Sequence, residues 1–289
     1  MKRAIVMGAS SGIGHEVAQL LIADGWTVGV AARHIDKLAD LQNVAPERVV
    51  VAKIDVTDNN AETNFRQLIE RIGGLNLYFH SAGIGWQNTT LDPDKEIKTM
   101  ETNATEFTRM VGAAYRYFTE NGGGHIACIT SIAGTKGLGV APAYSATKAL
   151  QNVYIQALEQ LAITKHQNIC FTDIRPGFVD TPLLAGAAHF PMLMTTKYVA
   201  HRIMKAIKKH KHICVIDTRW HILTFFWQYI PNCIWRHIPL IRTKRICNIN
   251  GYTVGLFIVL YGLNDHIGLN NTQKTATAIK CNGGRDEKD

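Results

Sequence analysis

The chain has no C-x-x-C pair, and none of its His, Cys, Asp and Glu residues cluster at the spacing of a metal site. Its six cysteines are scattered over 289 residues, and three of them lie in apolar runs typical of strands. This pattern excludes a disulfide scaffold and favours reduced, buried cysteines in a cytoplasmic protein without a metal. We also expect no signal peptide, because the first apolar strand begins almost at Met1.

Acidic residues are nearly missing from one late segment. Between Lys197 and Arg245 there are eleven Lys or Arg residues and a single acid, Asp217, so the net charge of +8 belongs to this segment. An anionic partner would therefore meet this part of the chain. We expect no nucleic acid there, because the bases lie among bulky apolar side chains instead of along a polar face.

Apolar runs of strand length alternate with helical patterns from the N-terminus onward. The predicted strands cover residues 3–7, 26–32, 49–56, 75–80, 126–130, 169–174 and 213–216. Repeated β-α-β units with short loops favour an α/β fold, a doubly wound parallel sheet (Rossmann fold) of about seven strands. Such sheets bind ligands beyond the carboxyl ends of their strands. Gly12, Gly83, Ser131 and Pro176 follow such ends, so we expect them to share one crevice.

The glycine turn after the first strand predicts a dinucleotide site. Gly8-Ala9-Ser10-Ser11-Gly12-Ile13-Gly14 leads into a helical pattern, and its glycines let the backbone approach a pyrophosphate at the helix N-terminus. An acid at the end of the second strand would bind the ribose of NAD. Ala32 and Arg33 stand there instead, which favours the 2′-phosphate of NADP(H) over NAD(H). Asp55, after the third strand, is placed to hydrogen-bond the adenine amino group.

Tyr144 and Lys148 are four residues apart in a predicted helix, which places the phenol and the ammonium one turn apart on one face. A cation beside a phenol favours the phenolate, so we expect Lys148 to bring the pKa of Tyr144 toward neutrality. Such a pair exchanges a proton with an alcohol or carbonyl oxygen. The spacing also occurs by chance in many helices, so its weight depends on the motifs that precede it.

These motifs together resemble the short-chain dehydrogenase/reductase family over residues 1–217, taken as one catalytic domain. The glycine turn matches the family's cofactor glycines, and Ser81-Ala82-Gly83 matches most of its Asn-Asn-Ala-Gly turn. The chain departs from the family at Met7, usually Thr, and at His80, usually Asn. We expect both departures to alter local hydrogen bonding only, with His80 an interior histidine.

The resemblance implies a catalytic tetrad of Asn103, Ser131, Tyr144 and Lys148. Tyr144 is implied to be the general acid/base, and Ser131 to orient the substrate oxygen. Lys148 is implied to hold the ribose hydroxyls of the cofactor, and Asn103 to fix a water that links Lys148 to solvent. The implied cofactor-binding residues are Gly8, Ser10, Ser11, Gly12, Ile13, Gly14, Arg33, Asp55, Val56, Ser81, Ala82, Gly83, Tyr144, Lys148, Pro176, Gly177, Val179 and Thr181.

The segments after the tetrad bear on substrate and partners. Residues of about 182–196 are small and apolar and match the family's substrate lid, which with Trp86 favours a small apolar carbonyl or alcohol substrate. Residues 218–245 predict a basic, aromatic helical extension that contains three of the five tryptophans. Two interpretations of residues 219–245 stay open. The segment binds an anionic membrane, peripherally on its inner face, or its rings cover the substrate pocket or a subunit contact.

The last part of the chain carries no functional signal. Its apolar run 252–263 is too short to span a bilayer, which takes about 20 residues. The remainder of 246–289 is polar and predicts disorder. The resemblance further implies a homodimer or homotetramer, paired through the helices that bear Asn103 and Tyr144.

The predicted function is NADP(H)-dependent interconversion of a carbonyl and a secondary alcohol. The alternative, from another class, is a non-catalytic NADP-binding sensor or scaffold. The intact tetrad argues against it, because a site without a catalytic task is free to lose its Tyr or Lys.

Overall fold

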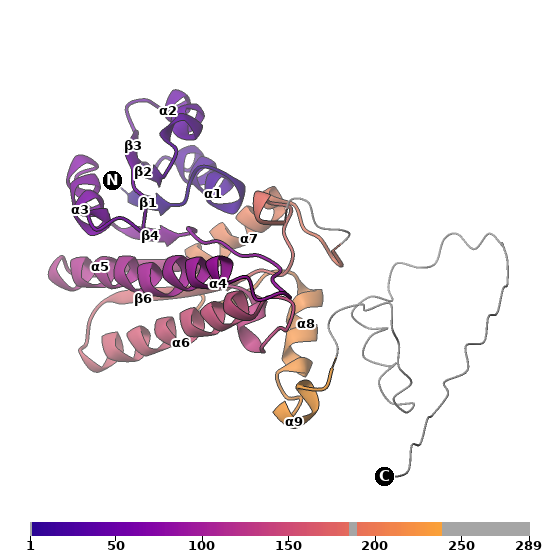
Figure 1. Cartoon of the computed structure of the whole chain (residues 1–289). Helices are drawn as coiled ribbons and strands as arrows, with labels where there is room; N and C mark the ends of the chain where they lie inside the picture. The colour runs from indigo at the N-terminus through magenta and orange to yellow at the C-terminus, as the bar shows by residue number, and fades with distance from the viewer. Residues whose placement is uncertain (1, 185–189, 239–289) are drawn as a thin grey trace, which may run out of the picture. The chain divides into compact units, whose positions relative to one another are not determined.

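A computed structural model describes residues 2–184 and 190–238 (Figure 1). At its centre is a seven-stranded parallel sheet in the order β3-β2-β1-β4-β5-β6-β7. The strands are β1 Arg3–Met7, β2 Thr27–Ala32, β3 Val49–Lys53, β4 Leu77–His80, β5 Gly124–Ile129, β6 Ile169–Arg175 and β7 Ile213–Val215. The predicted doubly wound sheet is therefore confirmed.

The order in which strands are added to the sheet changes between β1 and β4. Strands β2 and β3 are added on one side of β1, and β4 to β7 are added on the other side. Ala4 of β1 accordingly pairs with Val28 of β2 on one side and with Leu77 of β4 on the other. The connections after β1 and β4 consequently leave the sheet on opposite sides. This geometry opens a crevice at the carboxyl ends of the two central strands.

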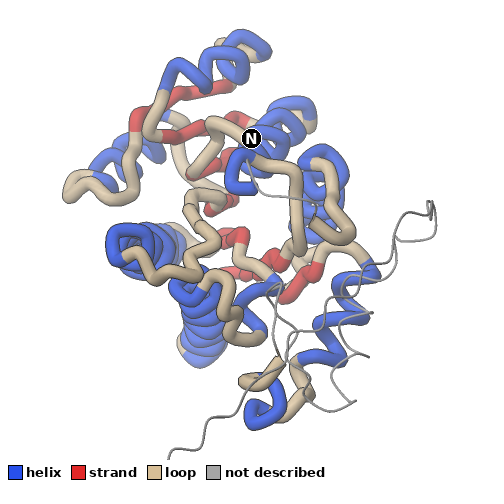
Figure 2. The backbone as a smooth tube through the Cα atoms, turned by 45° about the vertical axis from the view of Figure 1, so that its right-hand side comes forward, coloured by secondary structure: helices blue, strands red, loops and turns tan. Residues whose placement is uncertain are grey.

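Helices cover both faces of the sheet, as Figure 2 shows. On one face α1 Gly12–Ala23 packs against α7 Thr196–Lys208. On the other face lie α3 Ala61–Arg71, α5 Glu106–Glu120 and α6 Pro142–Thr164. Alternate strand residues point to one side of a sheet, and one such set forms the core beneath these three helices. Ile5, Tyr78, Ile126 and Phe171 belong to it and are almost fully buried.

Short elements complete the described chain. They are η1 Ile35–Leu38, α2 Ala39–Val44, α4 Pro93–Met100, η2 Glu101–Thr105, η3 Ile132–Thr135, η4 Pro182–Leu184, α8 Thr218–Trp227 and α9 Asn232–Trp235. None of the helices within residues 2–184 and 190–238 has the length and hydropathy of a membrane span.

The third strand ends earlier than predicted. β3 stops at Lys53, so Asp55 and Val56 lie in the loop that follows. The Asp55 side chain ends the extended run, because its Oδ1 accepts hydrogen bonds from the Thr57 amide at 3.0 Å and the Thr57 hydroxyl at 2.8 Å. Such a turn competes with continued strand pairing.

The helix predicted to carry Asn103 is broken into three pieces. A π-helical turn, η2, separates α4 from α5 and contains Asn103. The wider turn inserts extra residues and changes the angular phase of the helix. Met100 therefore does not share the apolar face of Phe107 and Val111. Phe107 and Val111 are fully buried, whereas Met100 is 39% exposed.

The described part of the helical extension packs on the catalytic core and belongs to the same compact unit. Trp227 Nε1 donates to Thr135 Oγ1 at 2.6 Å, and Trp235 Nε1 donates to the Gly137 carbonyl at 2.8 Å. Both rings are buried there, and Trp220 is buried against Gly177 and Phe178 in the loop after β6. All three tryptophans therefore pack on the catalytic domain of the same chain.

The cysteines differ in exposure. The four within the described residues are free, as expected. Cys128 on β5 is buried and Cys233 on α9 is exposed, so the prediction of buried cysteines is right for the first and wrong for the second. The predictions for residues 185–189 of the lid and for 239–289 lie outside the described residues.

Candidate active site

Tyr144 and Ser131 meet at the carboxyl end of β5. Ser131 ends the connection from β5 and caps η3, where its hydroxyl accepts from the Ala133 amide at 3.0 Å. Tyr144 lies in the first turn of α6 and is hydrogen-bonded to Ser131. The backbone at Gly85 presses on the phenol ring, because a Cβ there would lie 2.4 Å from Tyr144 Cδ2. A side chain at position 85 would therefore displace the ring.

Lys148 lies one turn behind Tyr144 on the same side of α6. Its Nζ donates to Gln151 Oε1 at 2.9 Å and to the Ile129 carbonyl at 3.2 Å, and it lies 5.6 Å from the Tyr144 ring centroid. The side chain is buried. Burial lowers the pKa of Lys148 to about 8, although nearby Asp173 favours the charged form.

The predicted effect of Lys148 on Tyr144 is wrong for this structure. The pKa of Tyr144 is raised, because burial disfavours the phenolate more than the hydrogen bond to Ser131 favours it. The Lys148 ammonium is directed to Gln151 and Ile129 instead of the phenol oxygen, which weakens the expected stabilisation. Tyr144 is consequently a protonated phenol at neutral pH.

Asn103 is fully buried in the π turn between α4 and α5. Its side chain holds the loop after β4: Oδ1 accepts from the Ile84 amide at 2.9 Å, and Nδ2 donates to the Ile84 carbonyl at 2.6 Å. The Asn103 carbonyl accepts from Gln151 Nε2 at 2.7 Å. All four tetrad residues therefore converge, with Gln151 joined to two of them.

Gln151 is a site residue that the sequence analysis missed. It follows Lys148 by three residues and Tyr144 by seven, so helical spacing places it on the same face of α6. This periodicity can indicate Gln151 as a site residue, because a polar residue on a buried helix face needs partners for its hydrogen bonds.

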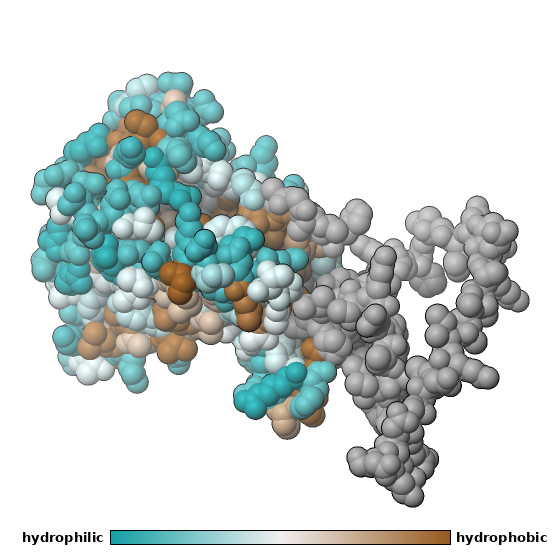
Figure 3. All heavy atoms as spheres, in the orientation of Figure 1, coloured by the Kyte–Doolittle hydropathy of each residue, from teal (hydrophilic) through white to brown (hydrophobic). Residues whose placement is uncertain are grey.

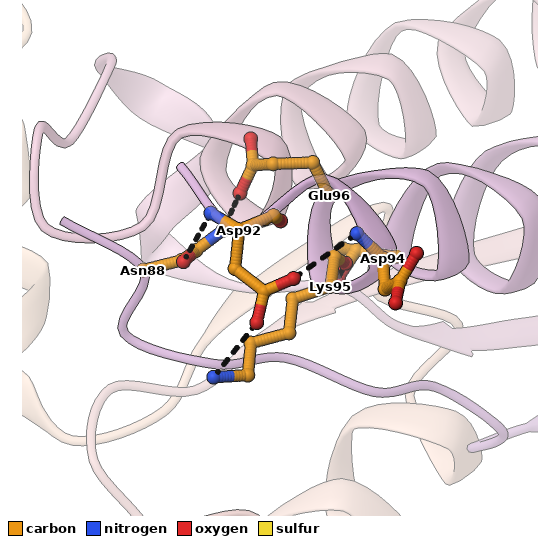
Figure 4. A network of polar contacts seen from close by, with 6 residues as sticks. Asn88, Asp92, Asp94, Lys95 and Glu96 are labelled. Atoms are coloured by element: carbon orange, nitrogen blue, oxygen red, sulfur yellow. Dashed lines mark hydrogen bonds and ion pairs between the residues drawn. The ribbon is translucent and has the colours of Figure 1, made fainter. Parts of the chain in front are cut away.

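The start of α6, and so the position of Tyr144, is fixed by Glu96, whose polar network at the start of α4 is shown in Figure 4. Glu96 on α4 accepts from Asn88 Nδ2 at 2.8 Å with one oxygen and from the Ala143 amide at 3.1 Å with the other. A carboxylate at a helix N-terminus satisfies free amides and interacts favourably with the helix dipole. Asn88 also binds Asp92 at the start of α4, so the network joins the beginnings of both helices.

The glycine turn is packed as a cofactor-binding turn requires. A Cβ on Gly8 would lie 2.6 Å from the Ala82 amide nitrogen, and one on Gly14 would lie 2.2 Å from the Gly8 carbonyl oxygen. Gly12 has a φ of +58°, and Thr181 Cγ2 lies 3.2 Å from its Cβ position. The predicted residues of the first turn, of 81–83 and of 176–181 thus share one crevice. Ser10, Ser11 and Gly12 line a cleft of about 390 Å³ there.

The residues predicted to meet the adenosine end lie beside this turn. Arg33 is exposed at the end of β2 and makes no hydrogen bond or ion pair with another residue of the described chain. Lys37, which the sequence analysis did not single out, lines the same cleft as Ser10. Asp55 binds Thr57 through one oxygen, and Val56 is buried.

The loop after β6 contains the residues predicted to lie beside the nicotinamide and leads toward the predicted lid. Pro176 is buried, and Gly177 packs on Trp220, whose Nε1 lies 2.3 Å from the Cβ position of the glycine. Val179 pairs with Met194, which closes the base of the lid. Phe190 of the lid lies 4.5 Å from Phe178, measured between ring centroids.

His80 is an interior residue, as predicted. Its ring is buried beside Tyr78, with Nδ1 2.8 Å from the tyrosine oxygen. Burial lowers the pKa of His80 to about 3, so the ring is neutral.

A family model described as short chain dehydrogenase matches residues 2–190. This chain belongs to that family. A similar oxidoreductase, itself uncharacterized, from Staphylococcus aureus strain N315 is 32% identical over 222 residues, which are 74% of this chain and 94% of that protein. Another from Mycobacterium tuberculosis strain CDC 1551 is 28% identical over 218 residues, 72% of this chain and 85% of that one. This short-chain dehydrogenase is therefore an oxidoreductase.

Two solved short-chain dehydrogenases share the fold. The crystal structure of one from Burkholderia cenocepacia J2315, in complex with NADP, has a TM-score of 0.70 and 21% identity, covering 82% of this chain and 98% of that chain. One from Streptomyces avermitilis has a TM-score of 0.68 and 22% identity, covering 78% and 93% respectively.

Proposed function

We propose that this short-chain dehydrogenase is an NADP(H)-dependent oxidoreductase that interconverts a carbonyl and a secondary alcohol on an apolar substrate. One observation carries the proposal. The Tyr144 phenol is hydrogen-bonded to Ser131, and the Lys148 ammonium lies 5.6 Å from its ring. A carbonyl oxygen gains negative charge during reduction. It is stabilised by a proton donor, a second hydroxyl and a nearby fixed cation, and the site provides all three.

The residues divide the chemistry with the cofactor. A bound nicotinamide supplies or accepts the hydride. Tyr144 donates its proton to the substrate oxygen in reduction, and Ser131 hydrogen-bonds and orients the same oxygen. Because burial raises the pKa of Tyr144, the phenol holds its proton at neutral pH. In this state Tyr144 can donate its proton to the carbonyl oxygen during reduction.

The glycine turn after β1 supports a dinucleotide of either kind, because side chains on Gly8 and Gly14 would collide with the chain's own backbone. Two features favour NADP(H) over NAD(H). Arg33 at the end of β2 is exposed and has no ion-pair partner within residues 2–184 and 190–238, whereas an acid at this position would repel a 2′-phosphate. The related Burkholderia enzyme was crystallised with NADP.

An apolar substrate is supported by the side chains near the lid. Phe178 contacts both Phe190 and Trp220, with ring centroids 4.5 and 5.5 Å apart. Leu193 on the lid is 48% exposed. Apolar walls with few polar groups suit a lipophilic aldehyde or ketone better than a sugar acid or a phosphate ester.

The first test is Tyr144→Phe, with rates of NADPH oxidation measured over a panel of lipophilic aldehydes, ketones and sterols. Loss of the acid should lower kcat about 100- to 10,000-fold, because general acid catalysis contributes a factor of this size. The matched control is Tyr154→Phe, on the same helix and outside the tetrad, which should keep the parental rate.

A Tyr144→Phe variant as fast as the parent would refute the proposal. Tight NADPH binding by the parent, without turnover of any substrate on the panel, would favour the sensor or scaffold function instead.

We further propose that α8 contacts an anionic membrane surface. Ile222, Phe225, Phe226 and Tyr229 recur at helical spacing and are 49 to 68% exposed, on the side opposite the buried Trp220 and Trp227. Exposed aromatic rings beside bases are typical of interfacial helices. Arg219 and Arg236 are exposed beside this stripe in sequence.

A homodimer through α6 is the second proposed contact. Leu150, Val153 and Leu161 recur at helical spacing on the outer side of α6 and are 38 to 64% exposed. Figure 3 shows hydrophobic side chains gathered on this side of an otherwise largely hydrophilic face. An apolar stripe between polar surroundings is typical of a subunit contact.

A further inference from the structure

Gln151 is buried without any exposed surface in the middle of α6. A buried primary amide is costly unless its donor and its acceptor both find partners. Both do here. Oε1 accepts from the Lys148 ammonium at 2.9 Å, and Nε2 donates to the Asn103 carbonyl at 2.7 Å. The side chain therefore spans the two groups directly.

This bridge stands where the family resemblance implies a water. In that arrangement Asn103 fixes a water that links Lys148 to solvent and lets protons pass. A neutral amide donates hydrogen bonds at one end and accepts at the other, but it does not release a proton near neutral pH. The Asn103 side chain is already bound to the Ile84 backbone through both its oxygen and its nitrogen.

We propose that Gln151 is a positioning residue that replaces the linking water and makes Lys148 a fixed charge instead of a proton carrier. The inference rests on the proposed function of the site. Of the three protons of the ammonium, one goes to Gln151 and one to the Ile129 carbonyl, and the third is left for the crevice. Tyr144, the partly exposed member of the pair, regains its proton from solvent at the mouth of the crevice.

The surroundings of Lys148 allow this role to be measured. The titratable groups that face it are Tyr144 on α6, Cys128 on β5, Asp173 on β6 and His80 on β4. Burial holds the pKa of Lys148 at about 8, so the charged form is lost as pH rises through that value. Activity that needs this charge should fall over the same pH range.

Two substitutions shift this pH range in opposite directions. Gln151→Met keeps the length and removes the acceptor, so the ammonium loses a hydrogen bond and the alkaline limb of kcat/KM moves down by about one pH unit. Gln151→Glu places a carboxylate beside the ammonium and moves the limb up by a similar amount, about one unit. The misplaced Lys148 in Gln151→Met should also lower kcat about tenfold to 100-fold.

The experiment records pH profiles of NADPH-dependent reduction from pH 6 to 10 for the parent, both variants and Gln156→Met. Gln156 is an exposed glutamine on the same helix, so its substitution should leave the profile unchanged. A second readout does not depend on turnover. The pKa of Lys148 is measured by NMR on protein labelled with ¹³C at lysine Cε, with the signal assigned by its loss in Lys148→Met.

Opposite shifts of the Lys148 titration in the two variants would support the proposal, even if the parent reduces no substrate and the proposed function fails. Unchanged titration in both variants would overturn it. Shifts in the same direction, accompanied by lower thermal stability, would overturn it too, because loosened packing admits water equally in both.

Discussion

Burial acts in opposite directions on the two titratable groups of the active site. It raises the pKa of the Tyr144 phenol and lowers that of the Lys148 ammonium to about 8, since in each case the charged form loses water. At neutral pH the phenol is protonated, and most of the lysine is still charged. Tyr144 can therefore donate a proton in the resting enzyme at neutral pH.

Arg33 decides the cofactor in our proposal, and its removal makes a residue-scale prediction. Arg33→Ala should weaken NADPH binding about tenfold. An exposed hydrogen bond to a phosphate contributes a binding free energy near the low end of the range for hydrogen bonds to charged groups. NADH binding should hardly change, since NADH has no 2′-phosphate. Fluorescence titration of both cofactors measures the ratio of their Kd values.

The control for this prediction is Arg66→Ala, which removes another exposed arginine, on α3. Equal weakening of NADPH and NADH by Arg33→Ala would contradict the assignment of Arg33 to the 2′-phosphate.

At the scale of elements, α8 is apolar on both sides. Trp220, Thr224 and Trp227 face the core and are buried, whereas the exposed stripe of Ile222, Phe225, Phe226 and Tyr229 faces away from it. A helix of this kind normally lies within a core. On a surface it leaves an apolar face without a cover among the described residues, which motivates the membrane proposal.

Phe225→Ser together with Phe226→Ser should weaken co-sedimentation with vesicles of anionic phospholipid about tenfold or more, since each ring loses part of its transfer free energy. Added salt should weaken the parent's binding as well, because the bases are screened. Val44→Ser with Tyr198→Ser, at exposed positions on α2 and α7, is the matched control. If the parent co-sediments no more with anionic vesicles than with vesicles that lack anionic lipid, the proposed membrane contact is ruled out.

The π turn shows how one element serves both packing and chemistry. By inserting η2 between α4 and α5, the chain lets Glu96 on α4 cap α6 while Asn103 turns inward to hold Ile84. A continuous helix could not keep both side chains in these directions, because its angular spacing is fixed.

For the whole molecule, the outer side of α6 predicts self-association. Val153 is 64% exposed at the centre of the stripe with Leu150 and Leu161. Val153→Lys should convert a dimer into a monomer, because burying two lysines without acids opposite them costs far more than the apolar contact contributes. Light scattering coupled to size-exclusion chromatography measures the mass.

Ile163→Lys serves as the control, since this residue is also exposed on α6 but points to another side of the helix. A parent that is monomeric at all concentrations would refute the dimer.

Much of this architecture follows from the sequence alone. Apolar runs predict the seven strands, and glycines predict the tight turn after β1, because strand pairing and tight turns depend on local residue types. The spacing of Tyr144 and Lys148 gave their common helix face for the same reason. The family followed from these local features in their order.

Only the tertiary structure decided what these groups meet. Helical spacing places Gln151 on the same face as Lys148, but its hydrogen bond to the Asn103 carbonyl exists only because α6 packs against the π turn. The pKa of Tyr144 rises instead of falling because desolvation depends on the whole surrounding fold. Which face of α8 is buried was likewise settled by its packing on the chain after β5, since both faces are apolar and sequence cannot choose between them.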